Sequence, residues 1–213
     1  MALTVCETFC SIMGESTLAG APAFFIRLTG CNLRCRYCDT TYAYAQGREM
    51  SIAALLAAAR SHPPWLVLVT GGEPLLQAET PRLLEELAAA GFTVYLETNG
   101  SRPMGEVDPR VHRVLDLKCP ASGMSGHNDW RNLALLTARD EVKFVISDRG
   151  DFDWALAVIK EHRLTARAPV LVSPVFGQVP PREAAAWILA SGLPLRLNLQ
   201  LHKLIWGPEA RGV

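Results

Sequence analysis

Short apolar runs that read as β-strands alternate along most of the chain with longer stretches that read as helices. We expect helices at residues 52–60, 80–90, 151–162 and 181–191, and strands at residues 24–28, 65–70, 93–97, 111–117, 141–146, 170–172 and 195–199. Strands that are apolar on both faces and separated by helices favour a parallel sheet covered by helices. About seven such strands predict an α/β fold, a partial (open) TIM-like barrel rather than a closed eight-stranded one.

The predicted architecture also indicates where function should lie. In parallel barrels and open α/β sheets, functional residues gather at the carboxyl ends of the strands. The sequence of 213 residues contains no linker and no internal repeat, so we expect a single domain over residues 1–213.

Charge and hydropathy limit the kinds of partner that we expect this protein to bind. Lysine plus arginine and aspartate plus glutamate number 21 each, so the formal net charge is zero. We therefore expect no general binding to nucleic acid or to an anionic membrane, since both need a basic face. No apolar run approaches the ~20 residues that span a bilayer, and no basic segment of a signal peptide is present. We expect a cytoplasmic protein, in which six cysteines favour metal binding or catalysis over disulfides.

The strongest chemical signal is a group of cysteines just after the strand at 24–28. Cys31, Cys35 and Cys38 have the spacing C-x3-C-x2-C, and thiolates are natural ligands of iron–sulfur clusters and of zinc. A structural zinc site normally has four protein ligands, whereas a cubane cluster on three cysteines leaves one iron open to an exogenous ligand. A zinc-binding interaction module, completed by Cys6, Cys10 or a histidine, is the alternative.

A glycine-rich segment, TGGEP at residues 70–74, ends the next predicted strand. Glycines allow the backbone to approach a ligand closely, although Gly-Gly and Pro also occur in ordinary turns. Together with the cysteine spacing and the aromatic Tyr37 before the last cysteine, this segment resembles the radical S-adenosylmethionine (SAM) superfamily.

The resemblance implies a radical SAM core with a [4Fe–4S] cluster on Cys31, Cys35 and Cys38. In this superfamily the open iron binds the amine and carboxylate of SAM. Cleavage of SAM then gives a 5′-deoxyadenosyl radical that abstracts hydrogen from the substrate. The cofactor carries this chemistry, while the protein supplies orientation and excludes water.

Further segments resemble the 7-carboxy-7-deazaguanine synthases, and they lie at residues 7–9, 13–15, 20–28, 38–40, 97–100, 118–124 and 200–203. The resemblance implies a Mg²⁺-dependent lyase of queuosine biosynthesis. Its reaction is the ring contraction of 6-carboxy-5,6,7,8-tetrahydropterin to 7-carboxy-7-deazaguanine with loss of ammonia. It also implies a homodimer and an electron donor such as flavodoxin or ferredoxin. A radical SAM activase of a glycyl-radical enzyme shares the cysteine motif and is the alternative enzyme.

The resemblance assigns roles to individual residues. Those expected at the pterin are Ile12, Met13, Gly14, Glu15, Arg27, Thr70, His202 and the carboxylate of Val213. Those expected at SAM are Tyr37, Cys38, Asp39, Gly71, Gly72, Glu73, Asp116, Leu117, Lys118, Ser173, Pro174, Val175 and Phe176. Glu73 is expected to accept a hydrogen bond from the SAM ammonium. Thr40 is expected to bind Mg²⁺ through its hydroxyl.

Plain alternatives exist for several of these residues. Arg27 lies in an apolar run and needs an anionic partner, either the substrate or an acid such as Glu15. Thr40 could cap a turn, and His202 could be structural. Met13 replaces the glutamine common in relatives, and a thioether cannot donate the hydrogen bonds of an amide. Asp116 and Leu117 stand where relatives carry serine and proline, which weakens the SAM assignment there.

Overall fold

The computed structural model describes residues 2–62 and 65–213. These residues form one nine-stranded sheet in the order β3-β1-β2-β4-β5-β6-β7-β8-β9. The strands are β1 (Ala2–Ile12), β2 (Pro22–Leu28), β3 (Arg48–Ser51), β4 (Leu66–Gly71), β5 (Thr93–Thr98), β6 (His112–Lys118), β7 (Glu141–Ile146), β8 (Val170–Pro174) and β9 (Leu195–Leu197). The α-helices are α1 (Ile52–Arg60), α2 (Thr80–Ala89), α3 (Arg149–Glu161), α4 (Pro181–Ser191) and α5 (Leu201–Trp206).

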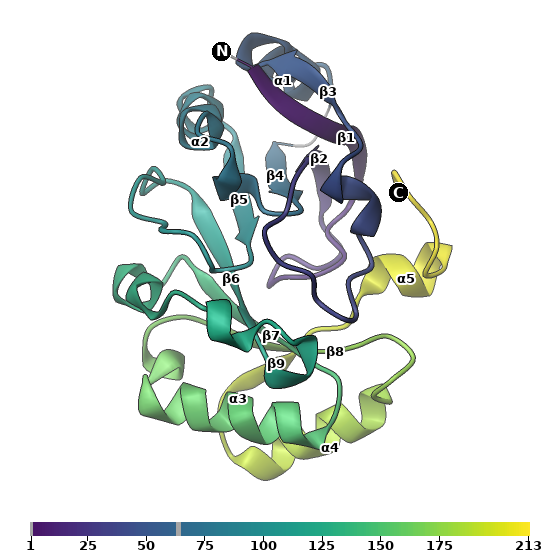
Figure 1. The fold of residues 1–213 in the computed structure, drawn as a ribbon, viewed down its shortest axis with the longest axis vertical. Helices are drawn as coiled ribbons and strands as arrows, with labels where there is room; N and C mark the ends of the chain where they lie inside the picture. The colour runs from purple at the N-terminus through teal and green to yellow at the C-terminus, as the bar shows by residue number, and fades with distance from the viewer. Residues whose placement is uncertain (1, 63–64) are drawn as a thin grey trace.

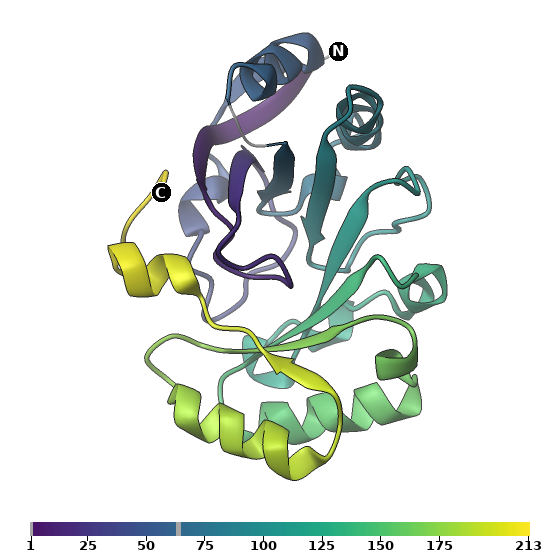
Figure 2. The same cartoon turned by 180° about the vertical axis from the view of Figure 1, so that it is seen from behind.

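The predicted fold class is confirmed. The strands from β2 to β9, with β3 excepted, pair in parallel. The sheet does not close, because β3 and β9 remain its two edges. Helices α1 to α4 lie along the outer side of the curved sheet, and α5 lies by its open side (Figures 1 and 2).

The expected strands and helices are all present, with ends shifted by up to two residues. Ser51 caps α1 by accepting a hydrogen bond from the Ala54 amide at 3.1 Å, and Asp148 caps α3 by accepting one from the Asp151 amide at 2.8 Å. These caps satisfy amides at the first turn that have no partner within the helix. The α3 helix begins two residues before the predicted start because Asp148 is its cap.

Two strands and one helix were not predicted. The β1 strand pairs antiparallel with both β2 and β3, with a register irregularity between Val5 and Glu7. Its mixed polar and apolar residues are mostly half-buried at this side of the sheet, so it lacks the continuous apolar run of a central strand. The short α5 helix has no buried residue.

The parallel strands present alternate residues to two different environments. On the outer side, residues such as Ile26, Val69 and Phe144 join the buried core beneath the helices. On the inner side, Phe25 and Leu68 belong to a smaller apolar cluster that also contains Met13, Ala23, Leu66, Tyr95 and Val114. Further along the same inner face the residues become polar, which creates a site at the carboxyl ends of the strands.

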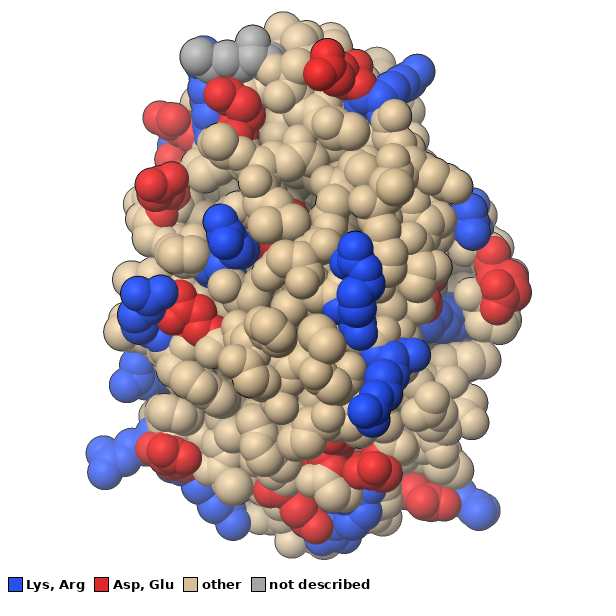
Figure 3. Space-filling view, in the orientation of Figure 1, with Lys and Arg blue, Asp and Glu red and all other residues tan. Residues whose placement is uncertain are grey.

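The charge distribution is mixed on the face shown in Figure 3. Basic and acidic side chains are interspersed around its edge, and its middle is largely uncharged apart from a few basic groups. Among the described residues, no helix has the length and apolar character needed to cross a membrane.

Candidate functional site

A cavity of about 280 Å³ opens at the carboxyl ends of the parallel strands. Its walls come from the loop after β1, the loop that carries the cysteines, the ends of β2, β4, β5, β6 and β7, the α5 helix and the tail at residues 208–213. This is the edge of the sheet at which the sequence predicts function.

Cys31, Cys35 and Cys38 all line this cavity as free thiols. The Cys31 sulfur accepts hydrogen bonds from the Leu33 amide at 3.4 Å and from the Asn99 side chain at 3.8 Å. Burial raises the pKa of the Cys31 and Cys35 thiols. Hydrogen bonds to cysteine sulfur are among the features that tune iron–sulfur clusters. Three thiols on one cavity wall, one of them already hydrogen-bonded, therefore fit a cluster.

The remaining cysteines lie apart from this group. Cys119 is buried in the core, and neither Cys6 nor Cys10 lines the cavity. Within the residues that the structure describes, no three His, Cys, Asp or Glu side chains form a group that could hold a single metal ion.

The glycine turn after β4 packs directly against the start of the cysteine loop. The Gly72 and Glu73 amides donate hydrogen bonds to the Leu28 and Gly30 carbonyls at 3.2 and 2.7 Å. A Cβ atom on Gly72 would lie 2.3 Å from the Gly30 oxygen, closer than side-chain carbons approach. A side chain at this position would therefore displace the loop that holds the cysteines.

Glu73 differs from the prediction. Its side chain is fully buried and does not line the cavity. Its carboxylate accepts hydrogen bonds from the Leu75 amide at 3.0 Å, the Thr98 hydroxyl at 2.8 Å and the Asn99 amide at 2.7 Å. Burial raises the pKa of Glu73, and these hydrogen bonds oppose the rise. Glu73 thus fastens the glycine turn to the end of β5 instead of facing a ligand.

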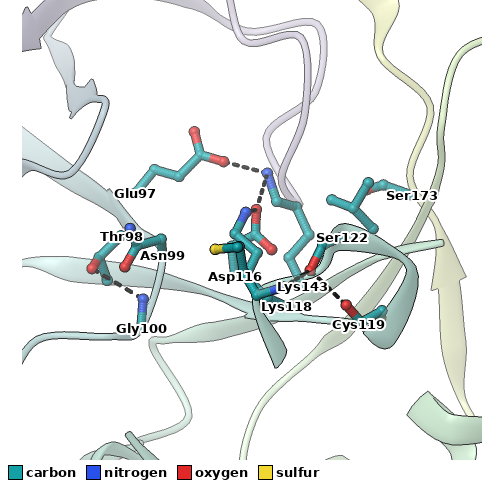
Figure 4. Close-up of polar contacts among 12 residues, drawn as sticks. Glu97, Thr98, Asn99, Gly100, Asp116, Lys118, Cys119, Ser122, Lys143 and Ser173 are labelled. Atoms are coloured by element: carbon teal, nitrogen blue, oxygen red, sulfur yellow. Dashed lines mark hydrogen bonds and ion pairs between the residues drawn. The ribbon is translucent and has the colours of Figure 1, made fainter. Parts of the chain in front are cut away.

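Buried charges gather on the inner face (Figure 4). The Lys143 ammonium contacts Glu15 at 3.0 Å, Asp116 at 3.5 Å and also Glu97. Lys118 contacts Asp116 at 2.9 Å. Burial raises the pKa of Glu15. Burial also acts to raise the pKa of Asp116, but Lys118 and Lys143 outweigh it and hold that pKa below its ordinary value.

Arg27 has a carboxylate partner that the sequence did not identify. Its Nε donates to Glu7 on β1 at 2.8 Å, and Glu7 also accepts from the Tyr42 hydroxyl at 3.0 Å. The guanidinium lies 5.9 Å from the ring centroids of both Phe9 and Tyr42. The considered partner Glu15 is instead paired with Lys143. Arg27 is therefore oriented within the cavity wall before any ligand is bound.

The α5 helix is tied to the cysteine loop through Asp39. This carboxylate pairs with Lys203 and accepts hydrogen bonds from Gln200 at 3.2 Å and from the Thr40 hydroxyl at 2.9 Å. Burial acts to raise the pKa of Asp39, but Lys203 and these hydrogen bonds hold it well below its ordinary value. His202, next to Lys203, lines the cavity, and burial lowers its pKa.

Comparison with known proteins identifies the family and the fold. Residues 25–164 match the radical SAM superfamily. A 7-carboxy-7-deazaguanine synthase from Chlorobaculum tepidum is 45% identical over 99% of this chain and 97% of its own length. Another, from Koribacter versatilis, is 42% identical over 99% of this chain and 100% of its own length. This chain belongs to the 7-carboxy-7-deazaguanine synthase family.

Solved structures agree with that assignment at the level of fold. The crystal structure of QueE from Escherichia coli superimposes with a TM-score of 0.77 at 22% identity, covering 94% of each chain. Streptococcus suis SuiB bound to S-adenosylmethionine superimposes with a TM-score of 0.60 at 14% identity, over 86% of this chain and 52% of that one. The resemblance read from the sequence is thus confirmed, and membership of the synthase family decides against the activase and the zinc module.

Most residues assigned through the family resemblance face the cavity. Of those expected at the pterin, all line it: Ile12, Met13, Gly14, Glu15, Arg27, Thr70, His202 and Val213. Of those expected at SAM, the ones that line it are Tyr37, Cys38, Asp39, Gly71, Gly72, Asp116, Lys118 and Val175. Thr40, expected at Mg²⁺, lines it too.

The other residues expected at SAM lie elsewhere, as Glu73 does. Leu117 alternates with its neighbours on β6 and points into the outer core. Ser173 is buried and accepts a hydrogen bond from Asn198 at 2.8 Å. Pro174 ends β8 inside the sheet, and Phe176 is exposed, with the Lys203 ammonium 6.0 Å from its ring centroid. Of the 173–176 segment, only Val175 reaches the cavity.

Several residues of this family member's cavity wall were missed by sequence reasoning. Glu97 and Lys143 are charged residues at inward positions of otherwise apolar strands, and that signal was available. Lys203 lies in a segment that was recognised but given no role. Phe9 and Tyr42 lie in segments whose geometry only the fold reveals.

Proposed function

We propose that this chain converts 6-carboxy-5,6,7,8-tetrahydropterin into 7-carboxy-7-deazaguanine with loss of ammonia, as a SAM-dependent lyase of queuosine biosynthesis. One observation carries the proposal. Relatives named 7-carboxy-7-deazaguanine synthase match at 42–45% identity over 99% of the chain, and the three cysteines of the loop line the same cavity as Glu15, Asp116 and Lys143.

The pterin side of the cavity is built from Glu15, Arg27 and the backbone next to Met13. Glu15 Oε1 is buried without a hydrogen-bond partner, so it is an acceptor for the N–H groups of the guanidine-like pterin edge. Arg27 is a fixed cation that suits the pterin carboxylate. The Met13 side chain has no strong hydrogen-bond donor or acceptor. Only its backbone groups would therefore hydrogen-bond the pterin.

The SAM side is built from the cysteine loop and the end of β6. Cys31, Cys35 and Cys38 would hold the cluster, and Asp116 and Lys118 would orient SAM. When bound, the cluster and SAM together supply the radical that removes a hydrogen atom from the substrate. The protein's own contribution is to position both ligands and limit access of water, and Tyr37 and the C-terminal tail contribute to the cavity wall.

Thr40 is proposed to bind Mg²⁺ together with the substrate carboxylate. Its hydroxyl lies 2.9 Å from Asp39 Oδ1 and lines the cavity. Oxygen donors of this kind, with water and a substrate carboxylate, suit Mg²⁺. A homodimer, a flavodoxin or ferredoxin as electron donor and a cytoplasmic location are part of the same proposal.

An anaerobic reconstitution tests the function. Iron and sulfide should reach about four per chain, as the cubane requires. Incubation with the carboxypterin, SAM, Mg²⁺ and a reductant should give the deazaguanine acid and ammonia in equal amounts, measured by mass spectrometry and an ammonia assay. If SAM is cleaved while the pterin is recovered unchanged, the proposed substrate is wrong and the superfamily assignment still holds.

A further inference from the structure

Lys143 is a buried cation in the middle of β7, and it belongs neither to the residues expected at the pterin nor to those expected at SAM. Its side chain is only 4% exposed. It faces three carboxylates from three separate elements, namely Glu15 in the loop after β1, Glu97 on β5 and Asp116 on β6. An ammonium group has three N–H donors, so one side chain can serve all three carboxylates. Figure 4 shows Lys143 between two of them, Glu97 and Asp116.

Two of these carboxylates keep an oxygen free. Glu15 Oε1 and Asp116 Oδ1 are buried and have no hydrogen-bond partner. A buried acceptor without a donor is costly, and in a cavity wall it indicates a ligand that supplies one. The local groups agree, because the three carboxyl groups of Glu15, Glu97 and Asp116 face the two ammonium groups of Lys143 and Lys118. The wall therefore favours ligands that bring N–H donors or positive charge.

The two free oxygens belong to different sides of the cavity. Glu15 follows Met13 and Gly14, the segment proposed to hold the pterin. Asp116 lies on the cluster side, since it pairs with Lys118 and its charge acts on the Cys35 thiol. Lys143 is the residue that contacts both carboxylates. The position of the Lys143 ammonium therefore sets the orientation of both carboxylates. That orientation determines where the free oxygen of each carboxylate points.

We propose that Lys143 is a positioning residue that couples the pterin site to the SAM site through Glu15 and Asp116. This inference rests on the proposed function and adds a property to it, namely that each ligand strengthens binding of the other. A ligand donor that fixes Asp116 also fixes the ammonium, and the ammonium then fixes Glu15 for the second ligand. The first ligand to bind bears the entropic cost of ordering these shared contacts. The second ligand then binds without that cost.

A purely structural lysine would behave differently. If Lys143 only neutralised buried acids, its removal would lower the melting temperature without changing how one ligand affects the other. The discriminating measurement is therefore the ratio of pterin dissociation constants without and with saturating SAM. Calorimetric titration of the reconstituted enzyme, with no reductant added so that neither ligand is consumed, gives this ratio directly.

We expect the wild-type ratio to be about fivefold or more, as is usual for coupled sites. Lys143→Met should reduce it to about one and weaken each ligand by more than about tenfold, as loss of one partner of a buried charge pair does. Lys118→Met, which removes a cation from Asp116 while leaving the Lys143–Glu15 pair, should weaken SAM more than the pterin. Lys160→Met, on the exposed side of α3, is the matched neutral control.

Either of two results from the wild type and Lys143→Met would overturn the proposal. One is a wild-type ratio near one, and the other is a Lys143→Met ratio equal to that of the wild type. If Lys143→Met does not fold, the isosteric Asp116→Asn replaces it and should weaken pterin binding about threefold or more, although Asp116 lies on the SAM side. An unchanged pterin affinity in that variant also refutes the coupling. A wild-type enzyme that binds SAM but no pterin refutes the proposed function itself, and the coupling falls with it.

Discussion

The contact between Gly14 and His202 gives a sharp test of how the cavity is closed. A Cβ atom built on Gly14 would lie 2.0 Å from His202 Nδ1 and 2.9 Å from its Cγ. Ordinary contacts begin at 3.4 Å, so the imidazole of a Gly14→Ala variant must withdraw by about 1.4 Å. The ring is carried by α5, and the Leu201 amide donates to the Gly14 carbonyl at 2.9 Å. Displacement of the ring therefore strains α5, which is also joined to the Gly14 backbone.

The cost of this movement falls on α5 and the tail after it. Overpacking of this size typically costs about 1–3 kcal/mol, and the Leu201 hydrogen bond contributes about 1 kcal/mol more if it breaks. The sheet need not respond, because α5 has no buried residue. We therefore expect Gly14→Ala to keep its cluster and a near wild-type melting temperature. Its pterin KM should rise about tenfold or more, since 1.4 kcal/mol is a factor of ten.

Steady-state kinetics and amide hydrogen exchange would check this expectation. In Gly14→Ala, exchange should accelerate at residues 201–213 and stay unchanged in the central strands. Gly105→Ala is the matched control, because nothing lies within 4 Å of a Cβ atom there. The double variant Gly14→Ala/His202→Ala removes the clash and should restore slow exchange. Wild-type exchange and KM in Gly14→Ala would refute the reasoning.

Three further predictions concern the cluster, the metal and the scaffold. Cys35→Ala should abolish cluster assembly, because two thiolates rarely hold a cubane, whereas Cys119→Ala should retain iron; iron and sulfide analysis checks both. Thr40→Val should raise the Mg²⁺ concentration needed for half-maximal activity while Thr40→Ser should not, and equal Mg²⁺ dependence would remove Thr40 from the metal site. Asp140 is buried and pairs with Arg113 at 2.6 Å, and despite its burial this pairing holds the Asp140 pKa below its ordinary value. Asp140→Asn should therefore cost about 3 kcal/mol at neutral pH. Its deficit in melting temperature should begin to shrink as the pH falls below about 4, where the carboxyl of the unfolded chain takes up a proton, and should be lost below the lowered pKa of the native carboxyl.

The parallel part of the fold could be predicted because burial on both faces leaves a strong mark on the sequence. The β4 strand reads Leu66 to Gly71 with hardly a polar residue, and α1 follows a serine cap. Such segments satisfy local propensity and tertiary burial at once. The β1 strand, by contrast, meets β3 over only its first residues and is mostly half-buried. Because many of its residues are polar, the sequence pattern does not indicate a strand there.

Glu73 shows where motif reasoning reaches its limit. The glycine turn was correctly placed at the carboxyl end of a strand, and its approach to the Gly30 carbonyl explains why glycine is needed at position 72. The direction of the next side chain depends on the partners that the fold supplies. Here the Thr98 hydroxyl at the end of β5 and the Asn99 amide just after it hold the carboxylate away from the cavity. No local pattern in the segment encodes those two donors.

Lys143 is the opposite case. Although it belongs to no motif, its place in the alternation of β7 predicts the direction of its side chain. In the buried strand Glu141–Ile146, the outward positions are Val142, Phe144 and Ile146, all in the apolar core. A lysine at the alternate position must face the other side of the sheet, where a charge is tolerated only with partners. The same alternation turns Arg27 and Asp116 inward on their strands. Applied strand by strand, this rule predicts which side of the sheet holds the charges, and only their pairing has to come from the structure.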